Sequence, residues 1–362
     1  MRIGPNGFDG RRIRLGIIGV GDVAHRDYLP EIHRLADLAE VVAVAGRSGA
    51  RAKATAERYG FPVWHCGYQA LLEVDEVDAV VNLTPWPMHA EVVAAALRAG
   101  KHVYSEKPLA PSAAEARRLG DEAASAGLIL ASAPSVLLFP QVLRALQAVT
   151  LGQLGPIHSA RAWAFGGVPP WEGYASDPSP YFTALSGPLT DLAVYPIHAL
   201  TGLLGPVTWI SAASSRTREE FTVGDGPAAG TRVPVQSDDN WHLLLRFSGG
   251  ALASVEANFC SVEAAGPECQ LFGERATLGF SLLDAAAPLV RSASDGWTEE
   301  TVPHDRLSGP DHILGVRHLI ECVLGRVRPV LTADHAAHVI DVLEAARRSA
   351  RDGRAIEVTS TI

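Results

Sequence analysis

Long apolar runs, an excess of basic charge and paired cysteines are all missing from this sequence of 362 residues. No stretch reaches the roughly 18 uninterrupted apolar residues of a membrane span, so we expect no membrane partner. The formal net charge is −9, and phosphate binding needs a basic face, which argues against nucleic acid as a partner. The four cysteines form no Cys-x-x-Cys pair, and no His lies at zinc-site spacing. We therefore predict free thiols in a reducing compartment and no metal site.

The length and composition indicate two globular domains, because 362 residues exceed what one hydrophobic core usually serves. In the first part of the chain, short apolar segments alternate with helical patterns. That alternation predicts βαβ units around a parallel sheet. The expected strands are 13–18, 40–45, 79–83, 102–105 and 128–131, and the expected helices are 23–38, 50–59, 90–99 and 113–126.

After residue 131 the pattern changes to strand-like runs, several of them joined by turns that contain glycine. This pattern predicts a second domain of α+β type with a largely antiparallel sheet. The expected strands are 157–165, 207–212, 242–247, 251–259, 268–272 and 276–280, and the expected helices are 142–149, 313–324 and 333–351. The predicted domains are thus 1–131 and 132–362, with the closing helices between 313 and 351 packing back towards the first domain.

A glycine pattern directly follows the first expected strand. Gly19, Gly21 and Ala24 form Gly-x-Gly-x-x-Ala, and Asp22 and Val23 complete the turn. Glycine at the first position permits a tight turn, glycine at the second lets the backbone approach a pyrophosphate, and alanine at the third permits close helix–sheet packing. Because the pattern lies between a strand and a helix, it predicts a dinucleotide-binding Rossmann domain rather than a merely glycine-rich turn.

The end of the second expected strand bears on the choice between NAD and NADP. An acidic residue there would bind the ribose hydroxyls and repel a 2′-phosphate. The segment after this strand is Gly46-Arg47-Ser48, without an acid. Arg47 can pair with a phosphate or stack on adenine, and Ser48 can donate a hydrogen bond, although Arg47 alone is also compatible with a solvated loop charge. The missing acid favours NADP(H) over NAD(H).

Ser105-Glu106-Lys107-Pro108 follows the fourth expected strand, at the sheet edge where ligands bind in this architecture. Only three of the 31 basic residues are lysines. Such a chain is expected to use Lys where a compact ammonium is needed, although codon bias gives the same count. An ammonium beside a substrate hydroxyl stabilises a developing alkoxide. We expect Lys107 in the reactive site and Glu106 beside the cofactor; a surface Lys after a strand is the alternative.

Asp191, Tyr195 and His198 form a second candidate group. Their spacing of i, i+4 and i+7 would place them on one face of a helix. Pro196 is tolerable only if that helix begins near Asp191. The alternative is that Thr190 or Asp191 simply caps the helix N-terminus.

Thr84, Pro85 and His89 end the third expected strand at the same sheet edge as Lys107. They are expected to contact the nicotinamide ribose. His89 is equally compatible with the first turn of a helix without a ligand.

These residues together resemble the Gfo/Idh/MocA oxidoreductases, the family of glucose–fructose oxidoreductase and inositol dehydrogenase. The resemblance rests on the glycine turn, on Glu106-Lys107-Pro108 and on Asp191-x-x-x-Tyr195, and it runs over nearly the whole chain. It implies a Rossmann domain followed by a domain with a large open sheet that forms homodimers or homotetramers.

The resemblance also implies that Lys107 and Asp191 are active-site residues. Tyr195 takes a position often held by a proton-transferring His, and His198 could assist or substitute for it. The sequence departs from the family at Ser132-Ala-Pro-Ser135, where many members carry Asn-x-Arg, so the resemblance implies no substrate contacts there.

The resulting expectation is an NAD(P)-dependent dehydrogenase that moves a hydride between nicotinamide C4 and a secondary carbinol carbon of a sugar or polyol. Tyr195 would transfer the hydroxyl proton, its ordinary pKa of about 10 lowered by Lys107 from the other domain. Asp191 would orient Lys107 and the substrate hydroxyl. Two alternatives stay open: a redox-neutral glycosidase that uses NAD, and a non-catalytic regulator that senses nucleotide.

The apolar run after Arg11 and Arg12 superficially resembles a twin-arginine export signal. That run is the predicted first strand and glycine turn, and its cleavage would remove the cofactor site. We therefore expect a cytoplasmic protein.

Overall fold

The computed structural model describes residues 12–171, 174, 176–224, 226–262, 264–294, 296–304 and 309–362, so Arg11 of the export alternative lies outside the described residues. Contacts divide the chain into two compact units, Met1–Ser135 with His312–Ala337 and Val136–Asp311 with His338–Ile362. A compact unit is defined by its contacts, whereas a domain can also fold alone. The domain boundary after residue 131 therefore stays a prediction.

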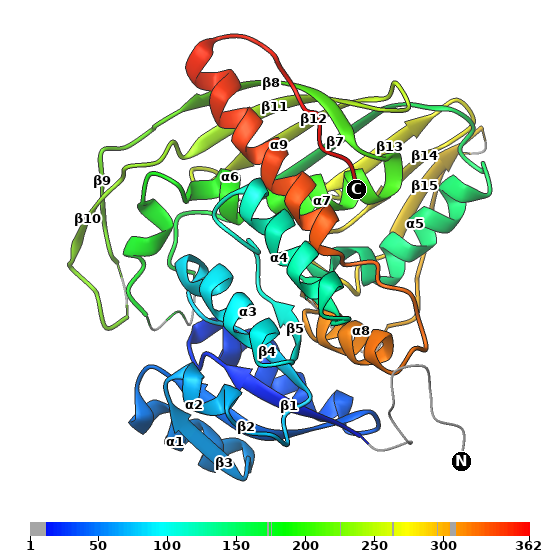
Figure 1. Ribbon diagram of the computed structural model, residues 1–362. Coiled ribbons are helices and arrows are strands. Elements are labelled where there is room, and N and C mark those ends of the chain that lie inside the picture. Colours follow the sequence, from blue (N-terminus) through cyan, green and yellow to red (C-terminus); the bar gives the residue numbers. More distant parts are fainter. Residues whose placement is uncertain are drawn as a thin grey trace. The chain divides into compact units, whose positions relative to one another are not determined.

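The first unit contains a six-stranded sheet in which every strand pair is parallel (Figure 1). Its order is β3-β2-β1-β4-β5-β6, so the chain runs outward in both directions from the central pair β1 and β4. This is the doubly wound order of a Rossmann fold, with ligand sites at the carboxyl ends of the strands. The strands are β1 (Ile13–Ile18), β2 (Ala39–Gly46), β3 (Val63–Cys66), β4 (Ala79–Asn82), β5 (His102–Ser105) and β6 (Leu130–Ser132).

The edge strand β3 was not predicted from the sequence. Its side chains are mostly exposed, with Val63 and Trp64 accessible to 42% and 43%, so it lacks the continuous apolar run of a central parallel strand. The strand before Ser105-Glu106-Lys107-Pro108 is consequently the fifth in chain order, not the fourth. Its predicted position at the carboxyl edge of the sheet is unaffected.

The segment after β1 is not the single α-helix predicted for residues 23–38. It contains a π-helical turn, Ala24–Tyr28, followed by a 3₁₀-helix, Leu29–Leu35. Pro30 explains the difference, because it has no N–H and its ring would collide with the carbonyl of Arg26 in a continuous α-helix. The break places Tyr28 at the end of the π-helical turn.

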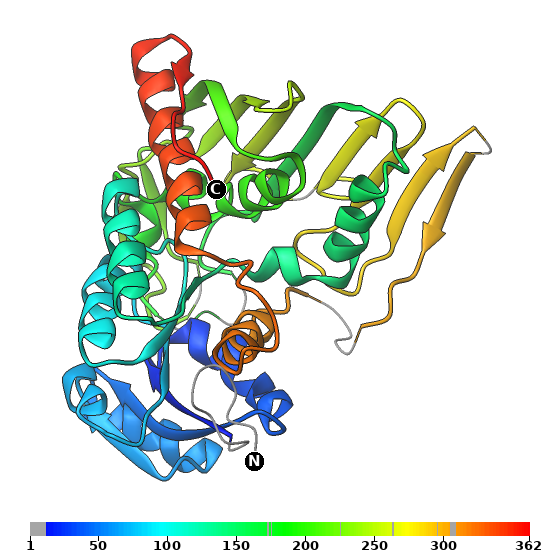
Figure 2. The same cartoon turned by 45° about the vertical axis from the view of Figure 1, so that its right-hand side comes forward.

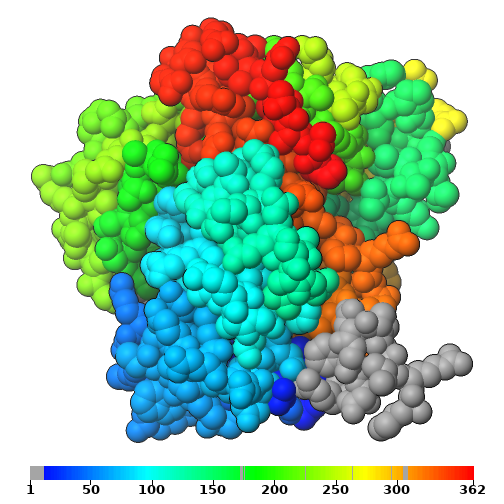
Figure 3. Space-filling view, in the orientation of Figure 1, coloured from blue at the N-terminus to red at the C-terminus, as the bar shows by residue number. Residues whose placement is uncertain are grey.

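The remaining helices of the first unit pack an apolar stripe inward. In α4 the buried residues include Ala116, Leu119 and Ala123, at helical spacing, and the opposite side lies on the molecular surface (Figure 3). Helix α8 packs against β5, β6 and the 3₁₀-helix. The helices are α1 (Gly49–Tyr59), α2 (Tyr68–Leu72), α3 (His89–Arg98), α4 (Ala113–Ser125) and α8 (Ile313–Val323), with a short 3₁₀-helix at Trp86–Met88.

The second unit is built on a nine-stranded sheet with the order β16-β15-β14-β13-β7-β12-β11-β8-β17. Among the strands that the structure describes here, only β7 and β12 pair in parallel, so the predicted mostly antiparallel sheet is confirmed. Its strands are β7 (Ile157–Phe165), β8 (Val207–Ser215), β11 (Asn240–Phe247), β12 (Leu252–Asn258), β13 (Cys269–Gly273), β14 (Thr277–Phe280), β15 (Leu289–Ala293), β16 (Gly296–Glu300) and β17 (Ile356–Glu357). A separate hairpin consists of β9 (Glu220–Thr222) and β10 (Arg232–Pro234).

Helices cover one face of this large sheet (Figure 2). Helix α5 packs against β14, α6 against β11 and β12, and α7 against β7. Alternate residues of β11, such as Leu243 and Leu245, are buried, whereas Leu244 between them is 43% exposed, as is Leu252 on β12. One face of the sheet is therefore the core of the unit, and on the other, here called the uncovered face, no helix of the described residues packs. The helices are α5 (Pro140–Thr150), α6 (Gly187–Asp191), α7 (Val194–Leu204) and α9 (Ala333–Asp352), with 3₁₀-helices at Ser135–Leu138 and Ser179–Phe182.

Candidate active site

The turn after β1 has the geometry that a dinucleotide requires. Gly19 has φ +105°, and a Cβ there would lie 2.4 Å from the carbonyl oxygen of Leu83, so only glycine fits. A Cβ at Gly21 would meet no heavy atom within 4 Å, which leaves this stretch of backbone open to approach. Ala24 is fully buried, as close helix–sheet packing demands. The three positions thus fit the three requirements of a pyrophosphate turn.

The other predicted cofactor residues of this part of the sheet lie around the same turn. Asp22 and Val23 are half-buried within it. Arg47 and Ser48 are exposed after β2, and the Ser48 side chain accepts a hydrogen bond of 3.4 Å from the amide of Arg51 as the N-cap of α1. No acidic side chain follows β2 at these positions.

A hydrogen-bonded group of polar residues links the ends of β4 and β5. The buried Asn82 side chain donates to the Ser105 hydroxyl at 3.1 Å and accepts from the Thr84 hydroxyl at 2.7 Å. Pro85, which follows, is exposed. The loops after the two strands are therefore fixed relative to each other by side chains as well as by the sheet.

His89 is the first residue of α3 and lies between the same two loops. Its Nδ1 is 2.7 Å from the carbonyl oxygen of Pro108, and its Nε2 is 2.8 Å from that of Thr84. Two acceptors favour the protonated ring, but burial opposes it more strongly, and the pKa of His89 is lowered. The ring of His89 is thus enclosed between backbone groups, and it ties the loop after β4 to the Lys107-Pro108 turn.

Glu106 and Lys107 stand directly after β5. The Glu106 carboxylate is buried and accepts two hydrogen bonds, from the Tyr28 hydroxyl at 2.5 Å and from the Lys107 amide at 2.9 Å. Lys107 itself is half-buried. Burial, together with the neighbouring carboxylate, raises the pKa of Tyr28 well above its ordinary value, so its hydroxyl is a neutral donor.

Sequence reasoning missed Tyr28, although one signal for it existed. A carboxylate expected at a buried sheet edge needs hydrogen-bond donors. The π-helical turn after the glycine pattern supplies one, but a regular helix over residues 23–38 gave no reason to single out Tyr28.

In the second unit, Asp191 and Tyr195 lie on different helices, so the prediction of one helix carrying Asp191, Tyr195 and His198 is wrong. Helix α6 ends at Asp191, and α7 begins at Val194. Tyr195 and His198 remain one turn apart on α7, half-buried and buried respectively. Pro196 lies in the first turn of α7, where a missing N–H costs no internal hydrogen bond.

The alternative in which Thr190 or Asp191 is an N-cap is also wrong. The N-cap of α7 is Ala193, which has no side-chain capping bond. The Thr190 hydroxyl donates instead to the carbonyl oxygen of Leu185 at 2.7 Å, and Arg347 of α9 donates to the same oxygen at 2.9 Å and to the Thr190 hydroxyl. These bonds fix the start of α6, the helix that carries Asp191.

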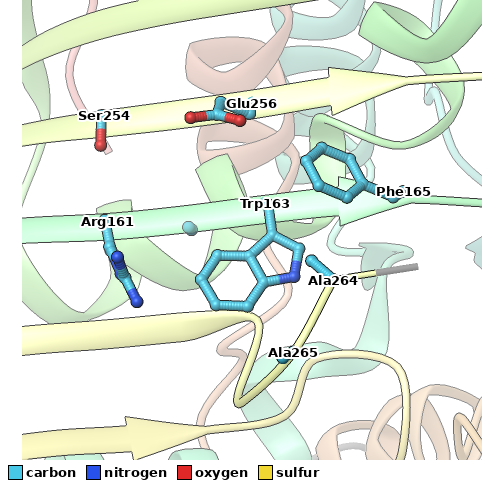
Figure 4. A pocket seen from close by; sticks show the side chains of 8 residues that line it. Arg161, Trp163, Phe165, Ser254, Glu256, Ala264 and Ala265 are labelled. Carbon is cyan, nitrogen blue, oxygen red and sulfur yellow. The ribbon is translucent and has the colours of Figure 1, made fainter. Parts of the chain in front are cut away.

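Two further features of the described residues bear on function. No group of three or more His, Cys, Asp or Glu side chains among them could hold a metal ion, and no helix among them is long and apolar enough to cross a membrane. A hollow on the uncovered face of the large sheet is lined by Arg161, Trp163, Phe165 and Glu256 (Figure 4). None of the predicted catalytic or cofactor-binding residues lines this hollow.

Comparison with known proteins agrees with both parts of this description. Residues 13–133 match the model of an oxidoreductase family with an NAD-binding Rossmann fold, and residues 142–279 match the Gfo/Idh/MocA C-terminal domain. A dTDP-3,4-didehydro-2,6-dideoxy-α-D-glucose 3-reductase of Actinomadura kijaniata is 39% identical over 221 residues. That match covers 60% of this chain and 64% of the enzyme, less than two thirds of its length.

Two other similarities extend over almost the whole chain. The D-xylose 1-dehydrogenase (NADP⁺) 2 of Haloferax volcanii is 28% identical over 95% of this chain and 99% of its own. The crystal structure of KijD10, a 3-ketoreductase from Actinomadura kijaniata in complex with NADP and TDP-benzene, has a TM-score of 0.76 and 27% identity, with 94% of this chain and 98% of that chain covered. Because the two matched segments together cover more than half of the sequence, one in each unit, the chain belongs to the Gfo/Idh/MocA family of oxidoreductases.

Proposed function

We propose that the protein is an NADP(H)-dependent oxidoreductase that interconverts a secondary alcohol and a ketone on a sugar, a polyol or a related small molecule. One observation carries the proposal: a turn shaped for a pyrophosphate lies at the same sheet edge as a half-buried lysine in a chain of an oxidoreductase family. The names of two similar enzymes, a dTDP-sugar 3-reductase and a D-xylose 1-dehydrogenase, support the substrate class.

The dinucleotide would be held by the glycine turn and by the loops at the ends of β2, β4 and β5. The proposed contacts are Gly19, Gly21, Asp22, Val23, Ala24, Arg47, Ser48, Thr84, Pro85, His89, Glu106 and Lys107. When bound, the nicotinamide supplies or accepts the hydride. Backbone amides at the turn would bind the pyrophosphate, since the start of the following helical segment presents N–H groups there.

The proton of the substrate hydroxyl would be handled by Lys107, Asp191 and Tyr195. The Lys107 ammonium would stabilise the developing alkoxide, and Tyr195 would transfer the proton. Asp191 would orient Lys107 and the hydroxyl, and His198, one turn beyond Tyr195, would assist. This assignment requires that the side chains of residues 107 and 195 converge on the reacting carbon.

The preference for NADP(H) is supported by the residues after β2. An acid is absent, and an exposed Arg47 is present, which suits a 2′-phosphate. The NADP⁺ in the name of the xylose dehydrogenase and the NADP bound to KijD10 support the same choice. The names of these proteins also favour net hydride transfer over the glycosidase and regulator alternatives.

The remaining parts of the proposal concern assembly and location. The uncovered sheet face exposes Leu244 and Leu252 to 43% each, and burial of such side chains against a second copy would favour a homodimer or homotetramer. We propose a cytoplasmic protein that acts on small molecules without nucleic acid or membrane partners. Light scattering of the purified protein tests the assembly, and cell fractionation tests the location.

The central experiment is a panel of sugars, polyols and ketosugars assayed with NADP(H) and NAD(H) by nicotinamide absorbance. Lys107→Ala is expected to abolish turnover and to leave the Kd for NADPH nearly unchanged. Equal loss of turnover and of NADPH binding would leave Lys107 only its role as a cofactor contact and would remove its catalytic role. Turnover without net absorbance change would support the glycosidase alternative.

A further inference from the structure

The carboxylate of Glu106 is a buried charge with a defined set of donors. It is 8% exposed, and its two oxygens receive one hydrogen bond each, from the Tyr28 hydroxyl at 2.5 Å and from the Lys107 amide at 2.9 Å. Both donors are uncharged groups. A buried carboxylate depends strongly on every donor it has, because an unmade bond leaves a desolvated charge.

Tyr28 is itself held in place on several sides. Its side chain is 1% exposed, its hydroxyl lies 3.3 Å from that of Tyr104, and its ring stacks on His312 with centroids 5.8 Å apart. The hydroxyl of Tyr104 in turn lies against Gly315 of α8, where a Cβ would be only 2.4 Å away. Tyr28 is thus a buried donor that contacts β5 through Tyr104 and the N-cap residue of α8, His312.

The contacts of Tyr28 and Glu106 connect the segment of the glycine turn to the backbone of Lys107. The π-helical turn that ends at Tyr28 begins at Ala24, the last position of the glycine pattern. Tyr28 binds one oxygen of Glu106, and the other oxygen binds the backbone N–H of Lys107. The segment that would hold the cofactor therefore also holds the backbone from which the Lys107 side chain extends.

We propose that Tyr28 is a positioning residue for Lys107. Its hydroxyl holds the Glu106 carboxylate, and the carboxylate holds the backbone amide of Lys107. The Lys107 side chain therefore extends from a fixed backbone position at the edge of the sheet. The inference rests on the proposed role of Lys107 in hydride transfer. It assigns Glu106 a supporting role through its carboxylate, in addition to any backbone contact with the cofactor.

Tyr28→Phe tests the inference, because it removes the hydroxyl and keeps the ring that packs on His312. We expect kcat to fall about 10- to 100-fold, while the KM for NADPH changes less than about twofold. The control is Tyr68→Phe, which removes a tyrosine–glutamate bond of similar length, from the Tyr68 hydroxyl to Glu91 at 2.6 Å, at an exposed position elsewhere in the same unit. Its kcat should equal that of the wild type.

A second readout does not depend on turnover. The chain has three lysines, Lys53, Lys101 and Lys107, so reductive ¹³C-methylation gives a small set of NMR signals that Lys→Arg variants assign. In Tyr28→Phe the Lys107 signal should shift or broaden and titrate differently, whereas those of Lys53 and Lys101 stay in place. Tyr68→Phe should leave all three unchanged.

The outcomes separate the inference from the proposed function. An unchanged kcat in Tyr28→Phe overturns the inference, as does an equal loss in both Tyr→Phe variants. If the wild type turns over no member of the substrate panel, the proposed function fails, and the Lys107 signal alone decides whether Tyr28 positions that residue. Should Tyr28→Phe not fold, Glu106→Met replaces it: the substitution keeps the side-chain length but removes both acceptor oxygens, so the Lys107 amide loses its partner and the Lys107 signal should move in the same way.

Discussion

Gly21→Ala should separate cofactor binding from folding, because this glycine is open on the side where a Cβ would stand. No heavy atom lies within 4 Å of an ideal Cβ, and Gly21 is not among the glycines with positive φ. Alanine therefore fits the folded backbone. We expect the free energy of unfolding to stay the same or to rise by about 0.4–1 kcal/mol, since alanine lowers the entropy of the unfolded chain.

The same methyl group would occupy the space through which a pyrophosphate approaches the turn. Hydrogen bonds from backbone amides to charged oxygens contribute about 1.5–3 kcal/mol each. Loss of one such bond, about 2 kcal/mol, raises the Kd for NADPH about 30-fold, because about 1.4 kcal/mol corresponds to a factor of ten.

NADPH binding is measured by titration, with quenching of the fluorescence of the seven tryptophans as the signal. The free energy of unfolding of the same preparations is measured by urea unfolding. Gly19→Ala provides the contrast. At φ +105°, with a Cβ 2.4 Å from the Leu83 oxygen, alanine should lower the free energy of unfolding by about 2–4 kcal/mol. If Gly21→Ala folds normally and binds NADPH as tightly as the wild type, the pyrophosphate does not pass Gly21 and the reasoning is refuted.

Three further predictions concern specificity, pH and packing. Arg47→Asp should lower kcat/KM with NADPH about 10- to 100-fold and leave that with NADH equal or higher, because a carboxylate repels the 2′-phosphate; an unchanged ratio would contradict the proposed contact. Burial lowers the pKa of His89, His102 and His318, so the unfolded state binds more protons below about pH 6.5. The free energy of unfolding, measured with urea, should therefore fall from pH 7 to pH 5.5, by up to about 1.4 kcal/mol per pH unit for each His. Equal free energies of unfolding at the two pH values would contradict neutral buried rings. Gly315→Ala should lower the free energy of unfolding by about 1–3 kcal/mol, because its Cβ would lie 2.4 Å from the Tyr104 hydroxyl; thermal unfolding checks it, and an unchanged Tm would show that α8 can shift.

Local sequence information was sufficient for the strands at His102–Ser105 and Ile157–Phe165, which have the predicted bounds. It was insufficient for β3, a four-residue edge strand whose side chains are mostly exposed. The glycine turn could be read in the same local way, because its requirements fall on neighbouring residues.

The contacts of Tyr28 that support Lys107 could not be predicted from the sequence, because they join segments far apart in the chain. The bond between Tyr28 and Glu106 spans 78 residues, and the stacking partner of Tyr28 is His312. No local sequence pattern predicts either of these two contacts. Only the cost of a buried carboxylate predicts that some donor must be near Glu106.

The break between α6 and α7 shows how one proline prevents a continuous helix, even where the spacing of the polar residues fits one. In a continuous helix the ring of Pro196 would collide with the carbonyl of Leu192, four residues earlier. The chain avoids this by ending α6 first: the amides of Leu192 and Ala193 both donate to the carbonyl of Pro188, and the Leu192 carbonyl then accepts from Tyr195, three residues on. Asp191 is thereby set by α6, whose start Arg347 fixes through Leu185, whereas Tyr195 is set by α7. Because two elements orient the two side chains, the spacing of i and i+4 between them carries no information about a shared face, and only Tyr195 and His198 keep the relation that the sequence suggested.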